Sequence, residues 1–142
     1  MSGYRILVAD PSPVVRKLLS LIFDAAKCDL SFASDGEEAL GMAIVEPPDL
    51  VITEMRLDRL DGAGLCERLK EDPRTSSAKV LFLTTSTLEW DRRRARRVGA
   101  DGYLTKPFSP STLLQKADEL SGGKLVDPAS LPGPAVEQEN CG

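Results

Sequence analysis

The chain has 142 residues, of which 42% are hydrophobic, and a formal net charge of −4, values that suit one globular domain with its own core. It contains no histidine and only three widely spaced cysteines, which excludes Ser-His and Cys-His hydrolase mechanisms and argues against a disulfide framework or a zinc site. The first residues lack a secretory signal pattern, and no apolar run reaches the roughly 20 residues that span a bilayer. We therefore expect a cytoplasmic protein with no membrane partner.

The first third of the chain alternates strand and helix patterns. Residues 6–9 are continuously apolar, as expected of a parallel strand covered on both faces. Ser12 and Pro13 then supply an N-cap and a first-turn proline for a helix with one apolar face. Residues 29–33 are more polar and predict an edge strand, and an apolar stripe over residues 39–44 predicts a second helix.

The middle of the chain continues the alternation around two further apolar runs. Residues 50–52 predict a central strand, and a third helix begins after Asp61 and Gly62. Residues 80–83 predict a fourth strand, also covered on both faces.

The helix expected over residues 88–98 differs from its neighbours in charge. It has only a thin apolar stripe, formed by Leu88, Ala95 and Val98, so tertiary packing should hold it less firmly than the other helices. Five arginines outnumber two acidic residues here and give a local charge of +3 in an otherwise acidic chain. The arginines are Arg92, Arg93, Arg94, Arg96 and Arg97.

The last elements complete an α/β pattern. A short strand around residues 103–104 precedes a helix that begins at Ser109 and Pro110 and ends before a pair of glycines. Five strands alternating with five helices predict a flavodoxin-like, doubly wound parallel sheet of order 2-1-3-4-5. Residues 1–121 should form this domain, and residues 122–142, rich in glycine and proline, are expected to be a disordered tail.

Four polar residues follow the predicted strands at the points where the apolar runs stop. They are Asp10, Glu54, Thr84 and Lys106. Because parallel strands end at one edge of the sheet, and ligands bind at that edge in doubly wound folds, these four side chains form a candidate site.

The segments around these residues resemble the receiver domains of bacterial two-component response regulators. The resemblance runs from about Tyr4 to Leu120 and rests on the stretches RILVADPSPVVRKLL, PDLVITEMRLDRLDG, VLFLTTS and GADGYLTKPF. In that family, two acids after the first strand and an aspartate after the third bind Mg²⁺, and this aspartate takes a phosphoryl group from a histidine kinase. A serine or threonine and a lysine hold the phosphoryl oxygens, and an aromatic residue switches rotamer. The resemblance implies that Thr84, Lys106 and Tyr103 take these last three roles, and that the Lys106–Pro107 bond is cis.

Two positions depart from the family pattern, and both lie in the site. Pro11 stands where the family has its second metal-binding acid, and Glu54 stands where it has the phosphorylated aspartate. Mg²⁺ would then have Asp10, Glu54 and the backbone carbonyl of Arg56, one carboxylate fewer for a cation that needs octahedral oxygen ligands. We expect Mg²⁺ binding to be weakened. Glutamate also moves the carboxylate outward by about an ångström, which should make phosphoryl transfer slow or absent.

These departures predict a stand-alone, single-domain signalling protein of a two-component phosphorelay pathway that binds a protein partner without phosphorylation and is not an enzyme. Glu54 could imitate the phosphorylated aspartate beside Thr84 and Lys106, or it could pair with Lys106 in an inert scaffold. The scaffold is slightly favoured, because a carboxylate has one charge where a phosphoryl group has nearly two. The alternative within the family is a receiver that still accepts a phosphoryl group at a degenerate Mg²⁺ site. The resemblance implies that partners bind the arginine-rich fourth helix, the fifth strand and the fifth helix.

Two functions of other classes can be weighed against this one. Haloacid-dehalogenase-type phosphatases also place an aspartate after the first strand, but their motif needs a second aspartate two residues on, where this chain has Ser12. The arginines could bind nucleic acid, but the sequence pI near 4.9 and the lack of a helix-turn-helix region after Leu120 argue against it. A protein partner with an acidic patch suits the arginines better.

Overall fold

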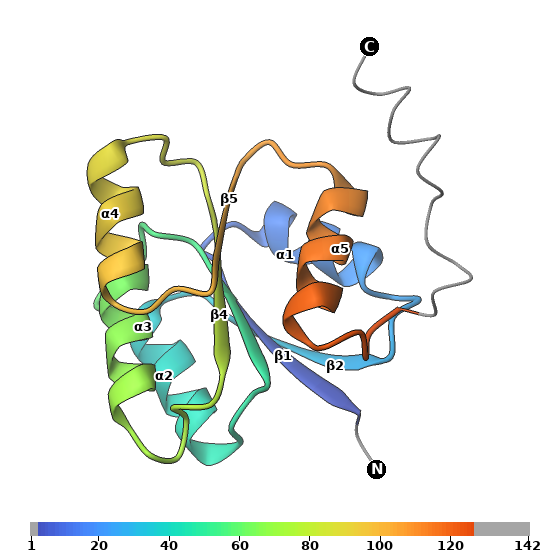
Figure 1. Ribbon diagram of the computed structural model, residues 1–142, viewed down its shortest axis with the longest axis horizontal. Helices are drawn as coiled ribbons and strands as arrows, with labels where there is room; N and C mark the ends of the chain where they lie inside the picture. Colours follow the sequence, from blue (N-terminus) through green and yellow to red (C-terminus); the bar gives the residue numbers. More distant parts are fainter. Residues whose placement is uncertain (1–2, 127–142) are drawn as a thin grey trace.

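The computed structural model describes residues 3–126, which form a five-stranded parallel sheet flanked by helices (Figure 1). Strands and helices alternate along the chain, and the strand order β2-β1-β3-β4-β5 confirms the predicted doubly wound fold. The strands are β1 (Tyr4–Ala9), β2 (Cys28–Ala33), β3 (Leu50–Thr53), β4 (Lys79–Thr84) and β5 (Gly102–Thr105). The helices are α1 (Pro13–Ile22), α2 (Gly36–Val45), α3 (Gly62–Glu71), α4 (Glu89–Arg97) and α5 (Pro110–Leu120). In this part of the chain no helix combines the length and apolarity that crossing a membrane requires.

The helices lie in two layers on opposite faces of the sheet. Helices α1 and α5 cover one face, and α2, α3 and α4 cover the other (Figure 1). Two buried apolar clusters fill the space between the sheet and these layers. Strands β3 and β4 contribute side chains to both clusters, which explains why their sequences are apolar at successive positions rather than alternating.

Helices α1 and α5 start at the residues that the sequence predicts. The Ser12 hydroxyl oxygen accepts a hydrogen bond from the Val15 N–H at 3.2 Å, and that of Ser109 accepts one from the Thr112 N–H at 3.4 Å. A proline follows each cap in the first turn, where its missing N–H breaks no helical hydrogen bond. These caps set where the chain turns back from the end of the sheet.

The buried face of α4 differs from the predicted stripe. Leu88 is 57% exposed, whereas Asp91 is 2% exposed and Ala95 is buried. Leu88 is the N-cap residue with extended backbone, so its side chain does not continue the helical face that Ala95 presents to the domain. The structure therefore replaces an expected apolar contact with a buried carboxylate.

The fold also extends beyond the predicted domain end at residue 121. Leu125 is buried in the same apolar cluster as Leu19 and Phe23. Its carbonyl accepts a hydrogen bond from the Lys27 N–H at 3.0 Å, and its N–H donates to Asp118 Oδ1 at 3.0 Å. Residues 122–126 are thus part of the domain rather than of a disordered tail, and the remainder of the predicted tail lies outside the described residues.

Candidate functional site

The strand register places the four candidate residues at one edge of the sheet. Asp10 and Glu54 follow β1 and β3, whose last residues pair directly, and the Glu54 N–H donates to the Ala9 carbonyl at 2.9 Å. Thr84 ends β4, and its carbonyl accepts the N–H of Lys106, the residue after β5, at 2.8 Å. Backbone hydrogen bonds therefore bring side chains 96 residues apart in sequence into contact.

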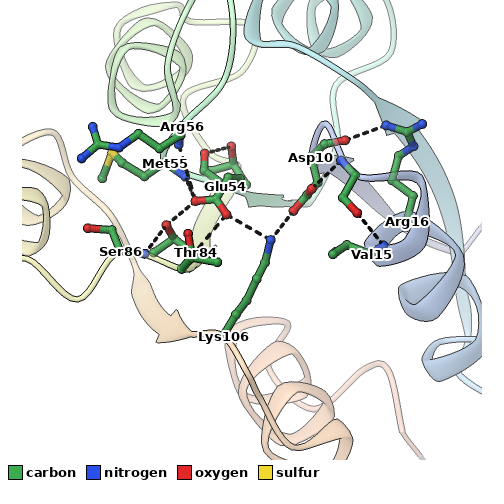
Figure 2. Close-up of polar contacts among 12 residues, drawn as sticks. Asp10, Val15, Arg16, Glu54, Met55, Arg56, Thr84, Ser86 and Lys106 are labelled. Carbon is green, nitrogen blue, oxygen red and sulfur yellow. Dashed lines mark hydrogen bonds and ion pairs between the residues drawn. The ribbon is translucent and has the colours of Figure 1, made fainter.

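Lys106 joins the two carboxylates of the site. Figure 2 shows its side chain reaching between Asp10 and Glu54, with Nζ 2.7 Å from Asp10 Oδ2 and 3.0 Å from Glu54 Oε1. The lysine side chain is 14% exposed and the carboxylates are almost fully buried. Burial by itself lowers the pKa of Lys106, but its hydrogen bonds to Asp10 and Glu54 outweigh burial and raise it. The amine is therefore a buried ammonium ion.

The Glu54 carboxylate is surrounded by hydrogen-bond donors. Oε2 accepts the Met55 N–H at 2.7 Å and a short hydrogen bond from the Thr84 hydroxyl, and Oε1 lies 3.4 Å from the Thr85 nitrogen. Burial alone raises the pKa of Glu54, but the hydrogen bonds from Thr84 and Lys106, the lysine charge and the Met55 N–H together lower it. Glu54 is thus held ionised although it is 5% exposed.

Asp10 has a different set of partners. Its Oδ1 accepts the Ser12 N–H at 2.9 Å, and its backbone carbonyl accepts a hydrogen bond from the Arg16 guanidinium at 2.7 Å. Pro11 lies between these contacts and is exposed. Asp10 therefore helps to start α1 as well as binding Lys106.

Asp10 and Glu54, two of the predicted Mg²⁺ ligands, lie on either side of Lys106. Among residues 3–126, no three acidic, cysteine or histidine side chains are grouped so that they could hold a metal ion. The two carboxylates of the site are instead bridged by the Lys106 ammonium. A hard dication needs several oxygen ligands at once, and Asp10 and Glu54 are the two side-chain carboxylates that this site offers.

Tyr103 lies beside the site on β5. Its ring stacks on Phe82 with centroids 5.9 Å apart, and its hydroxyl donates to the Ser86 carbonyl at 3.1 Å. The Arg92 guanidinium carbon lies 4.5 Å from the centroid of the same ring, an arrangement suited to a cation–π contact. Tyr103 thus connects the loop that follows Thr84 to α4.

The five arginines of α4 have different environments. Arg94 makes a bidentate ion pair with Asp61, at 2.5 and 3.2 Å, so it binds within the domain. Arg93 lies 3.5 Å from Glu89 on the exposed surface of the helix, and Arg96 and Arg97 are exposed. The cationic surface open to a partner is therefore smaller than the arginine count suggests.

One buried acid near the site, Asp91, was not among the residues predicted from the sequence. Asp91 Oδ2 accepts hydrogen bonds from the Ser86 hydroxyl at 2.5 Å and from the Arg56 guanidinium at 2.7 Å. An acidic residue in the first turn of a helix is favourable next to the helix dipole, even in water. Its burial therefore cannot be read from its position in the sequence.

Comparisons with known proteins agree with this architecture. The chain matches the family model of the response regulator receiver domain over residues 6–118. It is 39% identical over 106 residues to the alkaline phosphatase synthesis transcriptional regulatory protein PhoP of Bacillus subtilis, which covers 75% of this chain and 43% of PhoP. It is 32% identical over 112 residues to protein PilG of Pseudomonas aeruginosa, covering 79% of this chain and 83% of PilG.

Solved structures show the same fold. The chemotaxis response regulator CheY4 of Vibrio cholerae superposes with a TM-score of 0.78 at 28% identity, covering 84% of this chain and 99% of CheY4. The chain spans about half the length of several curated relatives that it matches, PhoP among them.

Proposed function

The chain belongs to the response regulator receiver domains of two-component signalling, and from this membership we propose that it signals by binding a protein partner without being phosphorylated. The acceptor position holds Glu54, and Pro11 replaces the second metal-binding acid. A phosphoryl-accepting receiver needs its aspartate and its Mg²⁺ in reacting geometry, which tolerates little displacement. The role is therefore binding rather than catalysis.

The observation that carries this proposal is the set of donors on Glu54. Its carboxylate accepts hydrogen bonds from the Thr84 hydroxyl and the Lys106 ammonium, the two groups that hold phosphoryl oxygens in the family. Tyr103 meanwhile donates to the Ser86 carbonyl. These contacts support the hypothesis that Glu54 partly imitates a phosphorylated aspartate, over the inert scaffold that the sequence slightly favours.

Weak Mg²⁺ binding is part of the same proposal. Lys106 already provides the positive charge between Asp10 and Glu54. A dication would have to displace the ammonium from a buried site that offers only two carboxylates, so its affinity falls.

The partner surface proposed is the face formed by α4, β5 and α5. Arg93, Arg96 and Arg97 are exposed on α4, and Trp90 is 68% exposed on the same helix. Hollows lie on both sides of Tyr103, one bordered by α4 and the other by α5. Arg92 and Arg96 border the hollow between Tyr103 and α4, and exposed cations beside an aromatic side chain suit an acidic protein partner.

The test is a titration with beryllofluoride and Mg²⁺, read through the fluorescence of Trp90. The wild type should give no saturable Mg²⁺-dependent change. The double variant Glu54→Asp/Pro11→Asp, which restores both family acids, should gain one, and Pro11→Asp alone serves as the matched control. A saturable response of the wild type would establish the phosphoryl-accepting alternative instead.

The nucleic-acid alternative is tested with the same protein. Duplex DNA should not bind at moderate salt, because the chain as a whole is acidic. Salt-dependent binding that Arg93→Glu abolishes would contradict the preference for a protein partner.

A further inference from the structure

Helix α4 is attached to the domain more by polar contacts than by apolar ones. Asp91 and Ala95 are its only buried residues within the described structure. Its other attachments include the ion pair of Arg94 with Asp61 and the contacts of Asp91 with Ser86 and Arg56. The position of α4 therefore depends on a few charged groups.

Asp91 is the most buried of these groups. Its side chain is 2% exposed, and its Oδ2 accepts hydrogen bonds from both Ser86 and Arg56. A buried carboxylate that loses its partners is strongly unfavourable. Asp91 should therefore follow any movement of Ser86 or Arg56.

Both partners of Asp91 are connected to Glu54. On one side, Glu54 Oε2 accepts the N–H of Met55 at 2.7 Å, and the Arg56 nitrogen lies 3.5 Å from the same oxygen. Met55 and Arg56 thus form a short backbone segment that leads from the Glu54 carboxylate to the guanidinium that binds Asp91.

On the other side, Thr84 provides the connection. Its hydroxyl donates to Glu54 and accepts the Ser86 N–H at 3.1 Å. Figure 2 shows Arg56 and Ser86 on the side of Glu54 that faces away from Lys106. Glu54 and Asp91 are therefore opposite members of one closed ring of hydrogen bonds, in which Arg56 forms one arm and Thr84 with Ser86 forms the other.

We propose that Asp91 is the positioning residue that couples the carboxylate of Glu54 to the arginine-bearing helix α4. A change of charge or length at residue 54 moves the donors on both arms, and Asp91 transmits the movement to the first turn of α4. The use of this coupling in partner binding rests on the proposed function. The coupling itself is a property of the folded domain.

The test is a double-mutant cycle read by amide hydrogen exchange over residues 89–97. Glu54→Gln removes the charge of residue 54 while keeping the length and shape of its side chain. It should change exchange in α4 by about fivefold or more, as expected for coupled residues. In the Asp91→Asn background the same substitution should change α4 exchange by less than about twofold.

The matched control is Arg94→Gln, which breaks the ion pair between α4 and Asp61 without touching the ring. It should loosen α4, yet leave the response to Glu54→Gln intact. If Arg94→Gln also removes the response, Asp91 acts only as a general anchor and the proposal is wrong. An unchanged response in the Asp91→Asn background, or no response to Glu54→Gln in the wild-type background, overturns it as well.

A second variant covers the case in which Asp91→Asn does not fold. Arg56→Gln removes one arm of the ring at a side chain that is 60% exposed, so the domain should remain folded. It should reduce the response of α4 to Glu54→Gln at least about twofold, and an undiminished response contradicts the ring. Binding of beryllofluoride by the wild type would refute the proposed function and leave this coupling unaffected.

Discussion

Replacing Lys106 by methionine tests whether the buried ammonium holds the site together. Methionine has a similar length but no charge, so Asp10 and Glu54 would face each other without a cation between them. Each carboxylate would keep its other hydrogen bonds. The change therefore isolates the loss of one positive charge.

The expected cost follows from burial. Removing one partner of a buried ion pair costs about 3–5 kcal/mol, and the 14% exposure of Lys106 places this case near the lower end. With a urea m-value of about 2 kcal/mol/M, a loss of about 3 kcal/mol lowers the unfolding midpoint by roughly 1.5 M. Far-ultraviolet circular dichroism during urea titration at pH 7 measures it.

The pH dependence of the free energy of unfolding gives a second check, because the direction of the change can be predicted. The fold lowers the pKa of Glu54, so wild-type stability from this group is present above its unfolded pKa of about 4.3 and is lost as pH falls through the folded pKa. In Lys106→Met, one of the two facing carboxylates should instead bind a proton more readily than in the unfolded chain. The difference in stability between wild type and variant should therefore narrow as pH falls.

At high pH the stability of the wild type should instead fall as pH rises. The fold raises the pKa of Lys106, so its contribution is complete below its unfolded pKa of about 10.4 and is lost as pH rises through the folded pKa.

Two further variants make the test decisive. Lys17→Met changes an exposed lysine of α1 and should alter stability by less than about 0.5 kcal/mol. Lys106→Met/Glu54→Gln removes one unpaired charge and should recover part of the loss. A loss below about 1 kcal/mol for Lys106→Met, or a double variant no more stable than the single one, would refute the reasoning.

Three other predictions follow from the packing. Leu125→Ala should lower stability by about 2–3 kcal/mol in urea unfolding, whereas an unchanged midpoint would place this residue outside the fold. Gly62→Ala would put a Cβ 2.3 Å from the Glu54 carbonyl oxygen and should cost stability, while Gly41→Ala, which meets nothing within 4 Å, should not. Burial raises the pKa of the Cys66 thiol to about 11, so iodoacetamide at pH 8 should label it only after unfolding, as peptide mass spectrometry would show.

Much of the fold could be predicted from the sequence, because local rules and the overall arrangement agree. Apolar runs of the length of strands, and serine caps followed by proline, located the central strands and the starts of α1 and α5. The rule that parallel strands end at one edge then placed Asp10 and Glu54 together. Local residue patterns and the common direction of the strands were enough for these predictions.

Leu125 and Asp91 could not be predicted in this way. Leu125 lies two residues after a pair of glycines, and nothing local distinguishes it from a residue of a disordered tail until α1 and α5 provide a surface to bury it. Asp91 has the position of a solvent-exposed helix-start acid. Its burial depends on Arg56, which is 35 residues away in the sequence.

The order of the elements and the kinds of group at the site can be read from the amino-acid sequence, including the longer acid at position 54 and the proline at position 11. How those groups pair depends on the folded chain. Hydrogen bonds and ion pairs depend on differences of a few tenths of an ångström, and these distances follow from strand register and loop paths. That is why the sequence could name Lys106 and Glu54 as neighbours, but only the folded chain placed one ammonium between two carboxylates and connected Glu54 to Asp91.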